Sequence, residues 1–181
     1  MNLFDKYKLG LPYGEFLAKH GSDGDRARWK QVHGQVSLSE AQRTLLKSFT
    51  RTMPVLCLAG AWCGDCVNQC PIFEHFAAAT PTIQVRYLDR DVHADVQQVL
   101  QVCGGNRVPV AVFFSEDGFE AGRFGDRTLS KYRAMMPDLS ATPGGGKDSL
   151  LTSVTQEWLD QFERVQWMLR LSARLRKLHN D

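Results

Sequence analysis

The sequence predicts an α/β protein in which a mixed central sheet is flanked by helices. Two observations lead to this fold class. Between residues 54 and 136 the apolar pattern follows the order strand, helix, strand, helix, and then two strands and a helix. A short turn separates the last two strands and joins antiparallel neighbours, whereas parallel strands need a longer crossover, usually a covering helix. We therefore expect a mixed sheet with helices on both faces.

The first 36 residues are polar and interrupted by glycine, and they predict short helices at Tyr13–His20 and Asp25–Val32. Ser37-Leu38-Ser39-Glu40 then fits the capping-box pattern, in which a serine and a glutamate three residues later bond free backbone N–H groups. Apolar residues follow at helical spacing. We therefore expect a helix that begins at Ser37, and its apolar residues are Leu45, Leu46 and Phe49.

The elements of the central block follow from the length and period of each apolar run. Strands alternate with period two or form short apolar runs, whereas helices repeat every three to four residues. Ser115-Glu116-Asp117-Gly118 is typical of a hairpin turn between the last two strands. The predicted strands are Pro54–Ala59, Thr82–Leu88, Val108–Phe114 and Phe119–Phe124, and the predicted helices are Asp65–Ala79, Val92–Val102 and Leu129–Met136.

A glycine-rich connector opens the tail, and a helical pattern without Gly or Pro then runs from Asp148 to Leu178. Its apolar stripe needs cover, either from its own domain, which we expect, or from a second copy in a homodimer. The stripe contains Leu151, Val154, Trp158, Phe162, Val165, Met168 or Leu169, and Leu175. The predicted organisation is an N-terminal helical extension (1–36), the main domain (37–137), a flexible connector (138–147) and a C-terminal amphipathic helix (148–181).

Composition excludes several classes of partner. Hydrophobic residues make up 43% and charged residues 23% of the 181 residues, as in ordinary globular proteins. The formal net charge of +2 gives no basic field for nucleic acid. The sequence has no apolar run long enough to span a membrane, and Met1–Lys6 leads into no secretory signal. We expect a cytoplasmic protein, whose thiols stay reduced.

Cys63 and Cys66 form a Cys-Gly-Asp-Cys sequence between a predicted strand and a predicted helix. A helix N-terminus stabilises a thiolate, so we expect Cys63 to have the lower pKa and the greater exposure. Cys66 lies one turn further on, within reach of Cys63. This arrangement favours thiol–disulfide exchange. Cys70 and His75 follow on the same helix, but a structural zinc site wants four ligands, so metal binding and inert core packing remain the alternatives.

Further residues carry a resemblance to a known family. Trp62-Cys63-Gly64-Asp65-Cys66 resembles the Trp-Cys-Gly-Pro-Cys site of thioredoxins, and the resemblance covers about residues 37–136. Pro71 is similar to the proline that kinks the active-site helix in that family. Arg107-Val108-Pro109 resembles its cis-proline loop, and Gly118 and Gly125 match its glycine positions.

The resemblance implies a thioredoxin-like fold and a thiol–disulfide oxidoreductase that reduces protein disulfides. It implies that Cys63 is the nucleophile and Cys66 the resolving thiol, that the Val108 backbone pairs with substrate, and that Pro109 is cis. Trp62 would shield the site, with Gly64 and Asp65 completing the motif. No bound cofactor is implied. The family is usually recharged by a flavin-containing thioredoxin reductase that uses NADPH.

The chain also departs from the thioredoxin pattern. Cys57 stands where the family has a buried acid that accepts the proton of the resolving thiol. Val85 or Arg86 replaces the paired lysine. Asp65 replaces a proline, either as a substitute base for Cys66 or as an acid that suits the first helical turn. Cys70 occupies the position of a small core residue, so we expect it to pack there.

Two other functions remain open from the sequence. A thioredoxin-fold binding or adaptor module with vestigial redox activity would use its extensions to recruit a partner, and the missing buried acid favours it. A metal-handling protein would use Cys63, Cys66 and Cys70.

Overall fold

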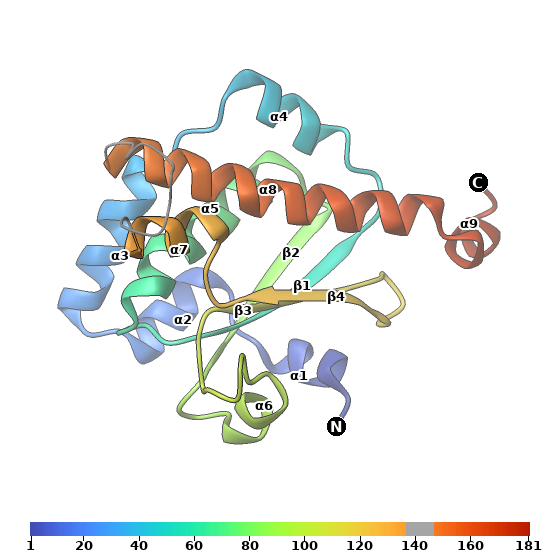
Figure 1. Ribbon diagram of the computed structural model, residues 1–181. Coiled ribbons are helices and arrows are strands. Elements are labelled where there is room, and N and C mark those ends of the chain that lie inside the picture. Colours follow the sequence, from blue (N-terminus) through green and yellow to red (C-terminus); the bar gives the residue numbers. More distant parts are fainter. Residues whose placement is uncertain (137–146) are drawn as a thin grey trace.

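The computed structural model describes residues 1–136 and 147–181, with side chains from Leu150 onward in the second part (Figure 1). Its centre is a four-stranded mixed sheet in the order β2-β1-β3-β4. β1 pairs parallel with β2 and antiparallel with β3, and β3 pairs antiparallel with β4. The predicted fold class is confirmed. The strands are β1 (Met53–Ala59), β2 (Ile83–Asp89), β3 (Val110–Phe114) and β4 (Glu120–Gly125).

Helices cover both faces of the sheet. The long helices α5 (Gly64–Ala79) and α8 (Lys147–Leu171) lie on one side, and α1 (Leu3–Leu9) and α6 (Ala94–Val99) lie on the other (Figure 1). None of the helices in the described residues is long and apolar enough to cross a membrane. The remaining helices are α2 (Tyr13–His20), α3 (Asp23–Gln35), α4 (Glu40–Lys47), α7 (Leu129–Met135) and α9 (Ala173–His179).

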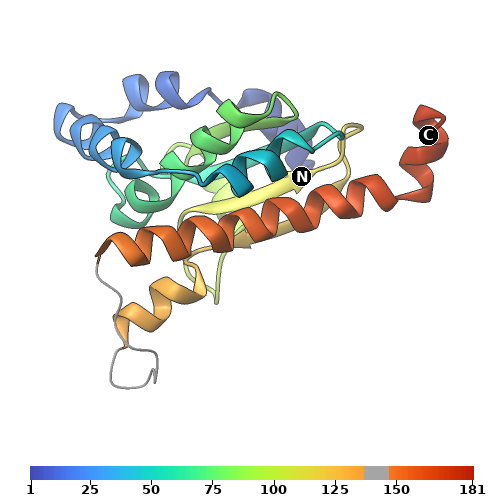
Figure 2. The ribbon, with the colours of Figure 1, turned by 90° about the horizontal axis from the view of Figure 1, so that it is seen from above.

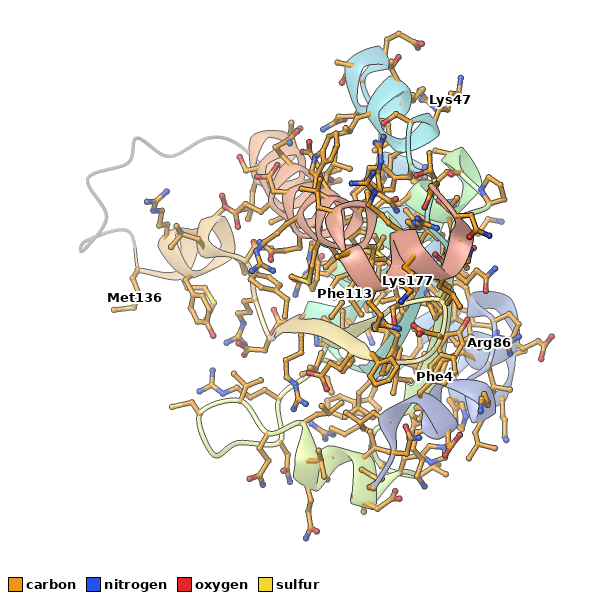
Figure 3. The ribbon with its side chains drawn as sticks, turned by 90° about the vertical axis from the view of Figure 1, so that its right-hand side faces the viewer. Phe4, Lys47, Arg86, Phe113, Met136 and Lys177 are labelled. Carbon is orange, nitrogen blue, oxygen red and sulfur yellow. The ribbon has the colours of Figure 1, made fainter. Side chains whose placement is uncertain are left out.

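Neighbouring residues of β3 show how the two faces are filled, because successive strand residues point to opposite sides. Phe113 packs against Phe162 of α8, with ring centroids 5.0 Å apart. Phe114 packs against Phe4 of α1 at 5.4 Å. Figure 3 shows Phe113 and Phe4 on these two sides of the molecule. The sheet is therefore buried on both faces. In agreement, every residue of β1 is buried.

The N-terminal extension shares the hydrophobic core of the sheet. Leu11 pairs with Tyr87 at the edge of β2, and Phe16 and Trp29 are fully buried. The α2 prediction is confirmed to the residue. Helix α3 is longer than predicted at both ends, because Ser22 caps it so that it begins at Asp23 and it continues to Gln35. Apolar periodicity did not predict α1.

The helix expected from Ser37 begins later. Ser39 is the N-cap of α4, its hydroxyl accepts from the Gln42 N–H, and the Gln42 side chain accepts from the Ser39 N–H. The capping box is therefore Ser39/Gln42 rather than Ser37/Glu40, because glutamine fills the same role as glutamate.

The tail contains two helices instead of the single one predicted. α8 ends at Leu171, and the Ser172 hydroxyl accepts from the Leu175 N–H to start α9. The predicted stripe is docked on the chain's own domain, with α8 lying along the rest of the fold (Figure 2). Leu169 belongs to it, whereas Met168 is 40% exposed. The predicted flexible connector lies outside the described residues except for Lys147.

Candidate functional site

The Cys-Gly-Asp-Cys sequence lies at the junction of β1 and α5. Cys63 is the N-cap of α5 and is half-buried, and Gly64 is the first helical residue. Cys66 lies in the first turn and is fully buried. The predicted order of exposure is therefore confirmed. The structure describes all five cysteines, and each is a free thiol.

Hydrogen bonds couple the two thiols of this pair. Burial opposes the ionisation of Cys66, but hydrogen bonds from the Cys63 and Cys70 thiols and from the Gly60 N–H, at 3.5 Å, lower its pKa. The hydrogen bond with Cys66, together with burial, raises the pKa of Cys63. The prediction of a lower pKa at Cys63 is wrong, because it considered the helix N-terminus and not the bonds to the buried sulfur. The two thiols share a proton and titrate as a pair.

The loop before β3 lies against Cys63. The Cys63 sulfur lies 3.7 Å from the Val108 carbonyl oxygen, and the Val108–Pro109 peptide bond is cis. Gly125, at the end of β4, packs closely against the backbone of this loop. A Cβ on Gly125 would lie 2.5 Å from the Pro109 carbonyl oxygen, so any larger residue would push the loop away. Val108 and Pro109 are therefore beside Cys63.

Trp62 lies on the outer rim of the site. Its side chain is 47% exposed, its indole N–H donates to Asp91 at 3.0 Å, and the Arg90 guanidinium lies 4.6 Å from the ring centroid. Trp62 therefore presents exposed aromatic surface at this rim.

The carboxylate of Asp65 is held by Arg127. The Arg127 Nε donates to the Asp65 carboxylate at 2.8 Å. The Arg127 Nη2 lies 2.6 Å from the same carboxylate oxygen. The negative charge of Asp65 also raises the pKa of Cys66, although less than the hydrogen bonds lower it. Asp65 thus forms an ion pair with the loop after β4, and this pairing works against a role as a free base for Cys66.

Two extensions contact the site through residues that sequence reasoning missed. The Trp29 indole of α3 donates to the Ala61 carbonyl at 2.7 Å, two residues before Cys63. The Trp158 indole of α8 donates to the Gln69 side chain at 2.9 Å, and Gln69 donates to the Asp65 carbonyl at 3.2 Å. Trp158 was predicted in the apolar stripe of the tail, whereas no local pattern pointed to Trp29, to Gln69 or to the hydrogen bonds that they form.

Behind Cys66, the core contains further polar groups. Cys57 of β1 is fully buried, as predicted, and its sulfur lies 3.8 Å from that of Cys70. The Tyr87 hydroxyl donates to the Cys70 carbonyl at 3.3 Å and to Glu74 at 3.0 Å. Burial raises the pKa of Glu74 to about 7. Cys103 is exposed.

A metal-binding arrangement is not found among the described side chains. They contain no group of three or more His, Cys, Asp or Glu residues placed to hold a metal ion.

Comparison with known proteins shows the fold and the family. A family model described as thioredoxin matches residues 10–140. A protein of unknown function from Pseudomonas aeruginosa has a TM-score of 0.71 and 16% identity, over 88% of this chain and 93% of that chain. An HIV epitope-scaffold has a TM-score of 0.64 and 18% identity, over 93% of this chain and 95% of that chain. At these identities the likeness shows the fold alone.

Thioredoxin O2 from Arabidopsis thaliana, in its oxidised state, has a TM-score of 0.36 and 20% identity, over 56% of this chain and 89% of that chain. This score is too low to carry an argument. No curated protein matches the sequence.

Proposed function

The chain belongs to the thioredoxin family, and we propose that it is a thiol–disulfide oxidoreductase that reduces protein disulfides through Cys63 and Cys66. One arrangement supports this function above all. An accessible thiol at the N-terminus of α5 is hydrogen-bonded to a buried thiol one turn later. The first sulfur can be reached by a substrate disulfide, and the second is shielded until a bond forms at the first.

The reaction follows from this difference in exposure. The pair loses one proton readily because the remaining proton is shared between the two sulfurs. Transfer of that proton to Cys66 leaves a thiolate at Cys63, which attacks one substrate sulfur and releases the other as a thiolate. Cys66 then loses its proton and attacks Cys63 Sγ. The substrate leaves with two thiols, and the chain keeps the Cys63–Cys66 disulfide.

Substrate binding is assigned to the rim of Cys63. By family resemblance, the Val108 backbone pairs with an extended substrate segment beside Pro109. The 3.7 Å contact between Cys63 Sγ and the Val108 carbonyl places that backbone next to the reacting atom. Trp62 offers an exposed ring on the same rim. Gly64 and Asp65 contribute to the first turn, and Arg127 holds Asp65 in place.

The catalytic cycle needs an electron donor. We assign this role to a thioredoxin-reductase-like flavoprotein, which the family resemblance implies, and we place the protein in a reducing compartment such as the cytoplasm. The reaction needs no bound cofactor. The apolar stripe of α8 is covered within the chain, which favours a monomer over a dimer formed through that helix.

Insulin reduction tests this function. The reduced protein should convert insulin disulfides to thiols, measured as free thiol released per chain. Cys63→Ser should abolish the reaction, and Cys66→Ser should accumulate a mixed disulfide between Cys63 and insulin, seen by mass spectrometry. Cys103→Ser is the control and should react like the unsubstituted protein, because Cys103 is exposed and outside the pair.

Two outcomes would overturn the proposal. A folded, reduced protein that transfers no electrons to insulin, glutathione disulfide or other disulfides would favour the binding or adaptor module. Full activity in Cys63→Ser would assign the chemistry to other thiols.

A further inference from the structure

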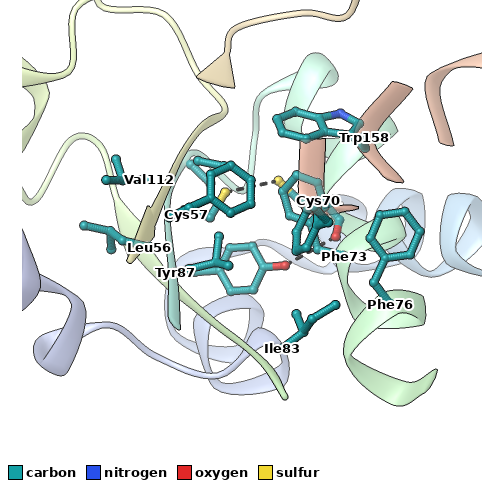
Figure 4. Close-up of a cluster of buried hydrophobic side chains, with 14 of the residues drawn as sticks. Leu56, Cys57, Cys70, Phe73, Phe76, Ile83, Tyr87, Val112 and Trp158 are labelled. Carbon is teal, nitrogen blue, oxygen red and sulfur yellow. Dashed lines mark hydrogen bonds between the residues drawn. The ribbon is translucent and has the colours of Figure 1, made fainter. Parts of the chain in front are cut away.

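Two buried cysteines that the proposed reaction does not use lie in contact behind the active-site pair. Cys57 comes from β1 and Cys70 from α5, and their sulfurs are 3.8 Å apart (Figure 4). Neither side chain has exposed surface. A disulfide bond is about 2.05 Å long, so the sulfurs need to approach by roughly 2 Å. The contact joins β1 to α5, which follow one another in the chain and pack together in the core.

The buried pair is continuous with the active site. Cys66 and Cys70 lie one turn apart on α5, and their thiols are hydrogen-bonded. Cys63 and Cys66 interact at the start of α5, and the Cys70 sulfur lies 3.8 Å from that of Cys57. The four thiols therefore follow one another from the half-buried Cys63 to the fully buried Cys57. Thiol–disulfide exchange along this series requires each sulfur to reach the next.

We propose that Cys57 and Cys70 form a second, internal redox couple that takes over the disulfide of Cys63 and Cys66. One reduced chain then carries four electrons and reduces two substrate disulfides before it needs recharging. This inference rests on the proposed function, because the first disulfide must form at Cys63 and Cys66.

The transfer is an isomerisation that needs no outside oxidant. After one turnover, the Cys70 sulfur attacks Cys66 Sγ, and the Cys63–Cys66 bond breaks to release Cys63. Cys57 then attacks Cys70 Sγ, and the Cys66–Cys70 bond breaks to release Cys66. Each attacking thiol gives up a proton and each released sulfur takes one up, so the electron count is unchanged. The product contains a Cys57–Cys70 disulfide and a restored Cys63/Cys66 dithiol.

An acid lies in the same part of the core. The Tyr87 hydroxyl bonds both the Cys70 carbonyl and Glu74 (Figure 4 shows the Cys70 bond). Burial raises the pKa of Cys57, and the negative charge of Glu74 raises it further. The transfer therefore needs each buried thiol to pass its proton to the sulfur that is released.

Thiol counting tests the inference on the full chain with Cys103→Ser, which leaves only the four thiols of this series. The reduced protein is incubated with excess glutathione disulfide, quenched in acid and alkylated. Mass spectrometry then counts the remaining thiols, and proteolysis identifies the linked peptides. We expect loss of all four thiols and a peptide that joins Cys57 to Cys70. Reduced chains should also open two insulin disulfides each instead of one.

Variants separate the relay from direct oxidation of the core. Cys70→Ala and, independently, Cys57→Ala should lose only two thiols and halve the insulin stoichiometry, so misfolding of one variant leaves the other as a test. Cys63→Ser should slow formation of the Cys57–Cys70 disulfide several-fold, because the buried thiols then have no accessible partner.

Three results are decisive. Loss of only Cys63 and Cys66 thiols would overturn the internal couple and leave the proposed function intact. Loss of no thiols would overturn both. Formation of the Cys57–Cys70 disulfide at an unchanged rate in Cys63→Ser would show direct oxidation and overturn the relay.

Discussion

The N-terminal extension and the C-terminal helix both complete the hydrophobic core, but they reach the candidate site in different places. The extension contacts the loop that precedes Cys63, where Trp29 donates to the Ala61 carbonyl and Arg28 donates to the Trp62 carbonyl at 3.2 Å. Helix α8 contacts the body of α5, where Trp158 donates to Gln69. One region therefore holds the loop that enters the Cys63–Cys66 turn, and the other holds the helix that follows it.

This difference separates positioning from stability. The extension fixes backbone carbonyls within two residues of the Cys63 thiol, so disturbing it should alter the alkylation rate of that thiol. The α8 contacts are dominated by aromatic packing, because Trp158 lies 4.6 Å from Phe73 and 5.0 Å from Phe124 between ring centroids. Disturbing them should mainly lower the free energy of unfolding.

The largest expected effect follows from Trp158→Ala. Removal of a fully buried tryptophan leaves a cavity and typically costs about 3–5 kcal/mol of unfolding free energy. The side-chain amide oxygen of Gln69 also loses its hydrogen-bond donor. Urea denaturation measures the loss, and we expect the alkylation rate of Cys63 to stay unchanged under conditions where the variant remains folded.

Trp167→Ala is the matched control for this variant. Trp167 lies on the same helix but is 45% exposed, and it should change the unfolding free energy little. Equal losses in the two variants would show that α8 is not anchored through Trp158. A large change in Cys63 alkylation in folded Trp158→Ala would contradict the separation of the two regions.

The next effect in size is expected from Trp29→Phe. This substitution keeps a buried aromatic ring and removes the N–H that donates to the Ala61 carbonyl. An unsatisfied buried acceptor costs about 1–3 kcal/mol. Because the carbonyl lies two residues before Cys63, we also expect a changed rate of Cys63 alkylation, measured against pH.

Trp167→Phe provides the control, because it removes an indole N–H that bonds Glu163 on the exposed side of α8. It should leave both stability and Cys63 alkylation nearly unchanged. An unchanged alkylation profile in Trp29→Phe, with reduced stability, would mean that the extension acts only through the core.

Local patterns predicted the sheet and the placement of Cys63 and Cys66 at the start of α5. β1 is an apolar run bounded by turns, and the Cys63–Cys66 spacing needs only one helical turn to bring the thiols together. Such signals lie within a few residues of each other. The parts that were wrong depend on alternative local partners, since Gln42 rather than Glu40 completes a capping box and Ser172 interrupts a continuous apolar stripe.

Other features depend on residues distant in sequence, and no window of the chain contains their cause. Helix α1 is held by the contact of Phe4 with Phe114. The sequence showed that Cys57 replaces the family's acid. It did not show that Cys57 would meet Cys70, because that contact requires the packing of α5 on β1.

The smallest expected effect concerns pH and belongs to the side of the N-terminal extension. Tyr13 of α2 packs on the Tyr87 ring at 5.9 Å, and Tyr87 bonds Glu74. Burial raises the pKa of Glu74 from 4.5 to about 7. Between these values the folded chain holds a proton that the unfolded chain has lost. The unfolding free energy should therefore fall as pH rises from about 4.5 to about 7 and level off above that range.

Glu74→Gln should remove this part of the pH dependence, because an amide does not titrate. The measurement is urea denaturation at a series of pH values for the unsubstituted protein, Glu74→Gln and the exposed control Glu15→Gln on α2. The difference between the unsubstituted protein and Glu74→Gln isolates Glu74 from groups that titrate in both chains. It should decline over the stated window, whereas Glu15→Gln should follow the unsubstituted protein. If the difference in unfolding free energy rose with pH instead, the folded chain would favour the charged Glu74 carboxylate. The burial of Glu74 beside the extension would then not disfavour its charge.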